Sequence, residues 1–218
     1  MRRKLLFALL LAALVACDDG TTKSYWDDGT LKSVLRYENG KLNGECLWYY
    51  ANGKPMMQAC YKDNAKEGRF MRWHENGNLM EDCYYKDNEL DSVYRSYSLK
   101  GILASEEHYS NGKLDGEFRK WYDNGQVFQD GQYADDMMDG SWLIFYSDGV
   151  LAAQAQFDKG SGTQTCYEQS GYKCMVTNYK DNLKHGREYH YNPDGTLTHV
   201  LIYEDGEVVG EERNNFSF

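Results

Sequence analysis

The chain has 218 residues, of which 24 are basic and 34 acidic, giving a formal net charge of −10. An acidic surface repels phosphate backbones and anionic lipid headgroups, which argues against a nucleic-acid partner and against a polybasic membrane-binding patch. Glycine is abundant (21), proline is scarce (2) and tyrosine reaches 19, which is typical of a turn-rich all-β chain.

Residues 1–16 have the features of a secretory signal peptide. Basic residues at positions 2–4 precede an apolar run from Leu5 to Val15, which is shorter than the roughly 20 residues of a spanning helix. The run ends in Leu-Val-Ala-Cys at positions 14–17, which resembles the bacterial lipobox, where the cysteine is diacylated and becomes the mature N-terminus.

In this interpretation Cys17 carries a lipid anchor, and residues 17–19 are the lipidated N-terminus of a protein of the bacterial cell envelope. Loss of the three basic leader residues takes the net charge from −10 to −13. The alternative is an ordinary secreted protein without a lipid on Cys17. The choice between inner and outer membrane stays open.

Four residue slots then recur with a period of 24 residues. Counted from the opening residue as position zero, an aromatic residue stands at position five, a glycine at position nine and a second aromatic at position seventeen. The opening slot holds Gly20, Gly44, Gly68, Ser92, Gly116, Gly140, Gly162 and Gly186, with Gly210 starting a stub. The early aromatic slot holds Tyr25, Tyr49, Trp73, Tyr97, Trp121, Phe145, Tyr167 and Tyr191. The late aromatic slot holds Tyr37, Tyr61, Tyr85, Tyr109, Tyr133, Phe157, Tyr179 and Tyr203. Self-similarity at a fixed period indicates a stacked array in which each unit needs its neighbours.

Each repeat is predicted to be a β-hairpin. Pairs such as Asn52-Gly53 and Asn124-Gly125 separate two short aromatic and β-branched runs, which is the pattern of a tight hairpin turn. A looser turn, such as Asn111-Gly112, leads to the next repeat. No sustained helical period occurs. We predict an all-β fold, an elongated single-layer antiparallel meander of about eight tandem hairpins and about sixteen strands over residues 20–210, followed by a C-terminal tail at 211–218.

The pattern resembles MORN repeats, specifically the bacterial MORN-variant repeat. The matching motifs are Gly-x-x-x-x-aromatic-x-x-[Asn/Asp]-Gly and Tyr-x-[Asn/Asp]-Gly-x-x-x-Gly. The fourth repeat departs from them at Ser92 and at Ser98-Leu99-Lys100, and the seventh is two residues short before Gly162. The resemblance implies a scaffold, a membrane-associated protein or an antitoxin-like protein.

The aromatic slots are expected to form the packing between hairpins, because a column present in every repeat is what stacked hairpins require. The competing interpretation is a carbohydrate-binding platform, which would need these rings exposed to solvent.

Five cysteines remain after Cys17, and cysteines tend to pair in an oxidising envelope. Cys46 and Cys60 lie symmetrically about Gly53, and Cys166 and Cys174 lie symmetrically about Ser170. Each pair is a disulfide candidate across its own hairpin turn. The fifth residue, Cys83, is left unpaired, and the alternative is five free thiols.

Catalytic and metal-binding motifs are not found. His190 and His199 flank the Asp194-Gly195 turn, but neighbouring strands spread such side chains in a line, whereas zinc needs tetrahedral ligands. No phosphate-binding loop or nucleophile–base motif occurs. We expect a protein that is not an enzyme and has no cofactor and no metal.

Position two of the repeat lies on the face opposite to position five, because side chains alternate along a strand. In four consecutive repeats it is Phe70, Tyr94, Phe118 and Trp142. A single layer covers only one face, and an uncovered apolar stripe is typical of an interaction site. We expect these residues, joined by Trp48 and Ile144, to contact a protein partner or a second copy of the chain. The alternative is that the sheet curls and buries them.

The expected function is therefore a non-catalytic protein-interaction scaffold of the cell envelope, with oligomerisation left open. The alternative is an antitoxin or immunity-type protein that neutralises a toxin partner.

Overall fold

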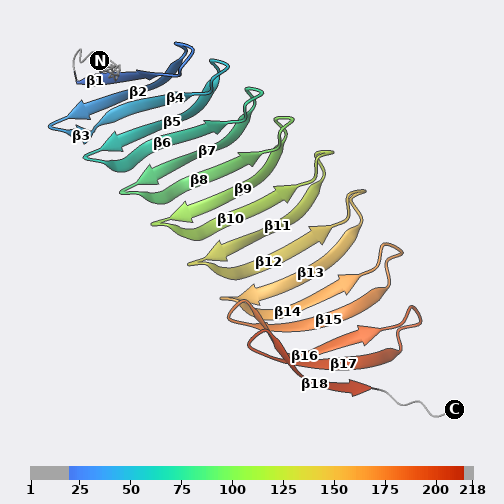
Figure 1. Ribbon diagram of the computed structural model, residues 1–218. Coiled ribbons are helices and arrows are strands. Elements are labelled where there is room, and N and C mark those ends of the chain that lie inside the picture. Colours follow the sequence, from blue (N-terminus) through green and yellow to red (C-terminus); the bar gives the residue numbers. More distant parts are fainter. Residues whose placement is uncertain (1–19, 214–218) are drawn as a thin grey trace, which may run out of the picture.

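The computed structural model describes residues 20–213, which form one open antiparallel sheet of 18 strands (Figure 1). Strands that follow each other in the sequence pair with one another, except that the short β3 and β4 both pair with β2 and not with each other. The strands of the first half are β1 (Thr21–Tyr25), β2 (Leu31–Glu38), β3 (Lys41–Leu42), β4 (Gly44–Tyr49), β5 (Pro55–Lys62), β6 (Ala65–Trp73), β7 (Leu79–Lys86), β8 (Glu89–Tyr97) and β9 (Leu103–Ser110). Those of the second half are β10 (Lys113–Trp121), β11 (Val127–Ala134), β12 (Met137–Phe145), β13 (Leu151–Asp158), β14 (Ser161–Tyr167), β15 (Lys173–Lys180), β16 (Leu183–Tyr191), β17 (Leu197–Glu204) and β18 (Glu207–Arg213). The all-β meander of tandem hairpins expected from the sequence is confirmed.

Two boundaries differ from the expectation. The strand count is 18 because Asn43 separates the short β3 from β4, and because the residues after Gly206, which include the start of the stub at Gly210, form β18. Since β18 continues to Arg213, the array extends three residues into the segment expected to be a tail. The leader, Cys17 and residues 214–218 lie outside the described part of the chain.

The two kinds of turn are the reverse of what the sequence suggested. The turns expected to be loose are two-residue turns: Glu38 pairs with Lys41 across Asn39-Gly40, and both central residues have positive φ, 51° and 77°. Positive φ at both central positions defines the type I′ turn, whose twist matches that of the flanking strands. Asp and Asn occupy these positions in several repeats because they tolerate the left-handed region better than other non-glycine residues.

The Asn-Gly and Asp-Gly turns are wider. Trp121 pairs with Val127, so five residues form the loop. Only Gly125 is left-handed, with φ of 82°, and its N–H donates to the carbonyl of Tyr122. The carboxamide of Asn124 instead accepts the N–H of Gln126 at 3.0 Å. The asparagine is therefore selected by this side-chain hydrogen bond, not by a positive φ.

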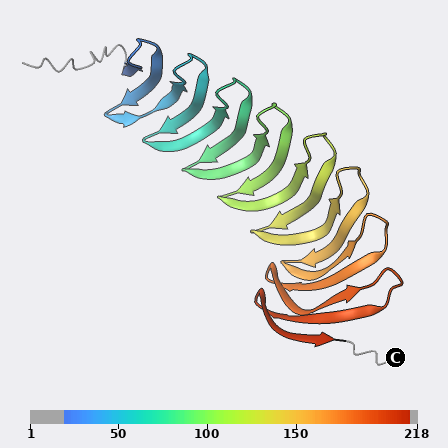
Figure 2. The same ribbon diagram turned by 45° about the vertical axis from the view of Figure 1, so that its right-hand side comes forward.

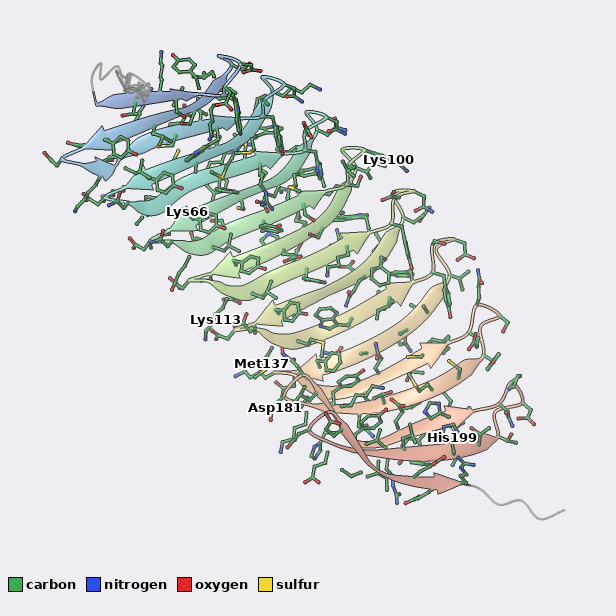
Figure 3. The ribbon with its side chains drawn as sticks, in the orientation of Figure 1. Lys66, Lys100, Lys113, Met137, Asp181 and His199 are labelled. Carbon is green, nitrogen blue, oxygen red and sulfur yellow. The ribbon has the colours of Figure 1, made fainter. Side chains whose placement is uncertain are left out.

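Side chains in both kinds of turn join each repeat to the next. At the wide turns, the hydroxyl of Tyr122 donates to the carbonyl of Phe145 at 2.8 Å, one repeat away. At the two-residue turns, the carboxamide oxygen of Asn88 accepts the N–H of Lys66 at 2.8 Å. Figure 3 shows Lys66, Lys113 and Met137 along the edge of the two-residue turns and Lys100 on the opposite edge.

The two faces of the sheet are buried to different degrees. In the first strand of each hairpin, side chains alternate between the two faces. We call first face the one that carries repeat positions two and four, such as Phe118 and Lys120. We call second face the one that carries positions three and five, such as Arg119 and Trp121. The strands are bowed (Figure 2), and every buried side chain in the described residues except Val200 lies on the first face. A single-layer sheet thus obtains its core by curling, so that one face packs against itself.

Candidate interaction surface

Large rings of the first face alternate with small residues on the adjacent strands. Phe70 lies opposite Ala59 on one side and opposite Cys83 on the other, and these three residues are 6%, 1% and 1% exposed. In the same way Trp142 lies opposite Ala155 and over Gly131. The small neighbours leave the space into which the large rings fold, so position two is the core of the array.

The aromatic residues at position seventeen pack against the rings of position two and complete this core. Tyr133 lies opposite Gly116, and its ring meets Phe118 edge to face with centroids 5.2 Å apart. Phe70 and Tyr85 repeat the arrangement at 5.6 Å. Such edge-to-face pairs are worth about 0.5–1.5 kcal/mol beyond the area that they bury. The expectation that aromatic columns pack the hairpins holds for this column, whereas the early column lies on the second face and Tyr25 there is 54% exposed.

The predicted partner-binding stripe is wrong for three of its four residues. Phe70, Phe118 and Trp142 are 3–6% exposed and have no surface to offer a partner, because the curl of the sheet buries them. Trp48 and Ile144 are half-buried. Of the four, only Tyr94 stays partly accessible.

Tyr94 lies at the wall of a hollow in the first face. The hollow has a volume of about 570 Å³ and spans the fourth repeat. Its lining residues are Leu90, Tyr94, Ser96, Ala104, Ser105, Glu107, Tyr109 and Lys120. The space exists because positions four and thirteen of this repeat are both serine, Ser96 and Ser105, whose hydroxyls hydrogen-bond at 2.7 Å.

Aromatic walls and a polar rim give the hollow a mixed chemistry. The rings of Tyr94 and Tyr109 meet edge to face at 6.3 Å. The Tyr109 hydroxyl donates to Glu107 at 2.9 Å, and the Tyr94 hydroxyl donates to Glu81 at 3.1 Å. Burial, together with the adjacent carboxylates, raises the pKa of both tyrosines, so both remain protonated donors at neutral pH. Lys120 lies over the ring of Phe118, 5.0 Å from its centroid.

The sequence contained a signal for this hollow that motif reasoning did not use. In six of the eight repeats position four or position thirteen holds a larger side chain, as with Trp48 and Met57, whereas both positions are serine in the fourth repeat. The first repeat has the same pair, Ser24 and Ser33, also hydrogen-bonded at 2.7 Å.

Towards the C-terminus the first face changes from apolar to polar. Position two of the eighth repeat is Glu188, which is 2% exposed. Its carboxylate accepts hydrogen bonds from Thr177 (2.9 Å), Lys184 (2.6 Å) and His190 (2.9 Å). Burial opposes the charged form, but these three hydrogen bonds outweigh it and lower the pKa of Glu188. A buried carboxylate held by three donors acts as a structural hub and is not exposed to a ligand.

The histidines do not form a metal site. His190 and His199 are paired in register, and their rings stack with centroids 4.2 Å apart and an interplanar angle of 11°. Ring nitrogens of parallel rings do not converge on one ion. Among residues 20–213, no group of three or more His, Cys, Asp or Glu side chains is placed to hold a metal.

The predicted disulfides are also wrong. All five cysteines of the described chain are free thiols. The wide turn adds a bulge residue to the returning strand, which shifts the register by one: Cys46 pairs with Ala59, and Cys60 pairs with Glu45. The two sulfurs therefore point to opposite faces. At the other candidate, Cys166 pairs with Met175, and Cys174 is itself the bulge residue.

These features define a class of protein: a solenoid-like stack of β-hairpins with a self-packed aromatic face. The model of the MORN repeat variant family matches residues 18–39, 42–63, 66–87, 114–135 and 138–159, which is 110 of the 218 residues. The chain belongs to this family of MORN-variant repeat proteins. The matches omit the fourth repeat, which contains the hollow, and the last two, which contain the Glu188 hub.

Curated proteins and solved structures show no close similarity to the chain. No curated protein matches the chain. Among solved structures, a chain of the crystal structure of TcdB2-TccC3 is similar over 88% of this chain at 12% identity. The TM-score is 0.22, and the match covers 15% of that chain. This similarity is too low to support an argument. The part of the chain that the structure describes contains no helix that could span a membrane.

Proposed function

We propose that this protein is a non-catalytic interaction scaffold that binds a protein partner through the hollow of the fourth repeat. The hollow itself is the observation that carries the proposal, because it is a concave, aromatic-walled site on a face that is elsewhere filled by its own side chains. Aromatic walls with a few polar groups at the rim are typical of the sites that receive an anchoring side chain.

The chemistry of the hollow favours an apolar anchor with polar flanks. Leu90, Tyr94, Ala104 and Tyr109 provide apolar contact area, and a side chain seated there would displace water from it. The rim carries one carboxylate, Glu107, and one ammonium group, Lys120. The carboxylate can accept hydrogen bonds from the partner's backbone or side chains, and the ammonium group can donate them.

The lipobox-like segment supports attachment of this scaffold to a membrane. A diacylated Cys17 would hold the array at the surface of the bacterial cell envelope, since two acyl chains give stable anchoring where one does not. The acidic array has no polybasic patch, so membrane attachment is assigned to the lipid. In a Cys17→Ser variant the protein should leave the membrane pellet after a carbonate wash; retention in the pellet would refute the anchor.

The partner site is tested by filling the hollow. A Ser96→Leu variant should stay folded but fail to retain the proteins that wild type captures from detergent-solubilised envelopes. The matched control is Ser24→Leu, which changes the same position of the first repeat, where the same serine pair occurs. Circular dichroism and a thermal melt confirm folding of both. If Ser96→Leu still retains every captured protein, the hollow is not the site.

A further inference from the structure

The second face changes its chemistry half-way along the array. Over β6–β11 it carries three arginine–carboxylate pairs: Arg69 with Asp82 at 2.8 Å, Arg95 with Glu106 at 2.7 Å, and Arg119 with Asp130 at 2.9 Å. Register links them into one row, since Arg95 also lies opposite Asp82 and Arg119 opposite Glu106. Most hydrogen-bonding groups of this ionic half bond to one another, whereas the buried Nε of Arg119 has no partner within the described residues.

Beyond Asp130 the same face carries a group of uncharged, hydrogen-bonding side chains. We call amide–hydroxyl patch the six side chains that cross β11–β14 there: Gln132, Ser141, Gln154, Gln156, Thr163 and Thr165. Five of them are neighbours by register, because Ser141 lies opposite Gln156, which lies opposite Thr163, while Gln154 lies opposite Thr165. Gln132 lines a hollow together with Ser141, and its own register partners are the acidic residues Glu117 and Asp139. Gln132, Ser141, Gln154, Gln156 and Thr163 are exposed, and Thr165 is half-buried.

Most of this hydrogen-bonding capacity is unused within the described residues. Gln154 donates to the hydroxyl of Tyr167 at 2.9 Å, and Thr163 donates to Asn178 at 2.9 Å. The side chains of Gln132, Ser141, Gln156 and Thr165 make no hydrogen bond with residues 20–213. Each glutamine amide offers two donors and one acceptor, and each hydroxyl can do both. The patch therefore presents donors and acceptors in close alternation and no net charge.

The patch is hollowed and has an aromatic border. One hollow of about 350 Å³ is lined by patch residues around Leu143. A second of about 470 Å³ shares Ser141 and Leu143 with it and extends to Arg119. The early aromatic residues Trp121, Phe145 and Tyr167 follow each other on this face at intervals of two strands, about 9–10 Å.

We infer that the amide–hydroxyl patch binds a neutral oligosaccharide. Sugar hydroxyls are alternating donors and acceptors without charge, which is what the patch offers, and the apolar face of a pyranose ring packs on an aromatic ring. Ionic ligands would find no counter-charge among the six patch side chains; the charged residues Glu117, Arg119 and Asp130 line only the larger, adjoining hollow. The interval between the border rings is close to the length of a disaccharide, so alternate sugars of one chain can meet successive rings. This site lies on the face opposite to the fourth-repeat hollow and does not depend on it.

The test uses cellohexaose and chitohexaose with the purified protein and isothermal titration calorimetry. Wild type should bind at least one of them, and a Gln132→Leu/Gln156→Leu variant should lose at least tenfold in affinity, since two hydrogen bonds at about 1 kcal/mol each exceed the 1.4 kcal/mol of a tenfold change. The matched control is Tyr84→Leu, which changes the same repeat position in the ionic half and should bind as wild type.

A second variant, Trp121→Ala, separates stacking from hydrogen bonding and should also weaken binding. A thermal melt of each variant shows that it is folded. The inference is overturned if neither sugar binds wild type, if the double variant binds as wild type does, or if a neutral Gln/Ser-rich peptide binds the patch and the sugars do not.

Discussion

Gly131 lies directly beneath the indole ring of Trp142. A Cβ built on Gly131 would come within 2.3 Å of the indole Cδ2 and within 2.6 Å of two further ring atoms. Gly131 is not in the left-handed region, so the demand for glycine here is steric and is set by one ring on the neighbouring strand.

A Gly131→Ala substitution should therefore destabilise the protein by about 1–3 kcal/mol, the usual cost of overpacking a core. Urea unfolding followed by far-ultraviolet circular dichroism measures it. Combining it with Trp142→Phe, which makes the ring smaller, should recover part of the loss, giving a favourable coupling in the double-mutant cycle. Strict additivity of the two changes would contradict the contact.

A Ser92→Gly substitution should stabilise the protein. Ser92 fills the opening slot with φ of 67°, a region where the flanking repeats place Gly68 and Gly116. The left-handed conformation costs a non-glycine residue about 1–2 kcal/mol, partly offset by the extra freedom that glycine gives the unfolded chain. A gain of about 0.5–1 kcal/mol in the free energy of unfolding is expected. Gly116→Ser is the reciprocal variant and should lose stability; equal stability of both variants and wild type would show that the slot is unstrained.

The Glu188 hub makes stability pH-dependent. Because hydrogen bonds from Lys184, Thr177 and His190 lower the pKa of this carboxyl from its ordinary 4.5, its contribution is fully present above that value. It is lost as the pH falls through the lowered folded-state pKa. Glu188→Gln should cost about 1–3 kcal/mol at pH 7, as expected when a buried charged hydrogen-bond network loses one member. The difference from wild type should narrow below about pH 4. A difference that is constant from pH 7 to pH 3.5 would contradict the assignment.

Thiol reactivity should follow burial. Burial raises the pKa of Cys83 to about 12 and of Cys166 to about 11, and Cys46 is 0% exposed. Since the thiolate is the reacting form, iodoacetamide at pH 8 should label Cys60 and Cys174 first and Cys46 and Cys83 last. Peptide mass spectrometry over time gives the order. In urea without reductant all five thiols should react; a Cys46–Cys60 or Cys166–Cys174 cross-link would contradict the register described above.

The sequence alone was sufficient for the fold class. The opening glycine and the aromatic slots recur because each repeat has the same surroundings as the next. Equivalent surroundings select the same residue types, so the stacking of repeats is visible in the sequence as a fixed period. The number of hairpins and their antiparallel order followed from it. The sequence also showed the aromatic residues at position two, but it did not show whether they are buried or exposed.

Two features became known only from the tertiary structure: one-residue shifts in strand register and the curvature of the sheet. One bulge residue at each wide turn moved Cys60 from the face of Cys46 to the opposite one, because side chains alternate at every residue. Curvature buried Phe118 and Trp142, which a flat sheet would have exposed, and left Tyr94 beside a hollow made by Ser96 and Ser105. Neither the bulge nor the curl changes the period of the sequence, and for that reason the repeat pattern predicted the array but not which of its faces is the core.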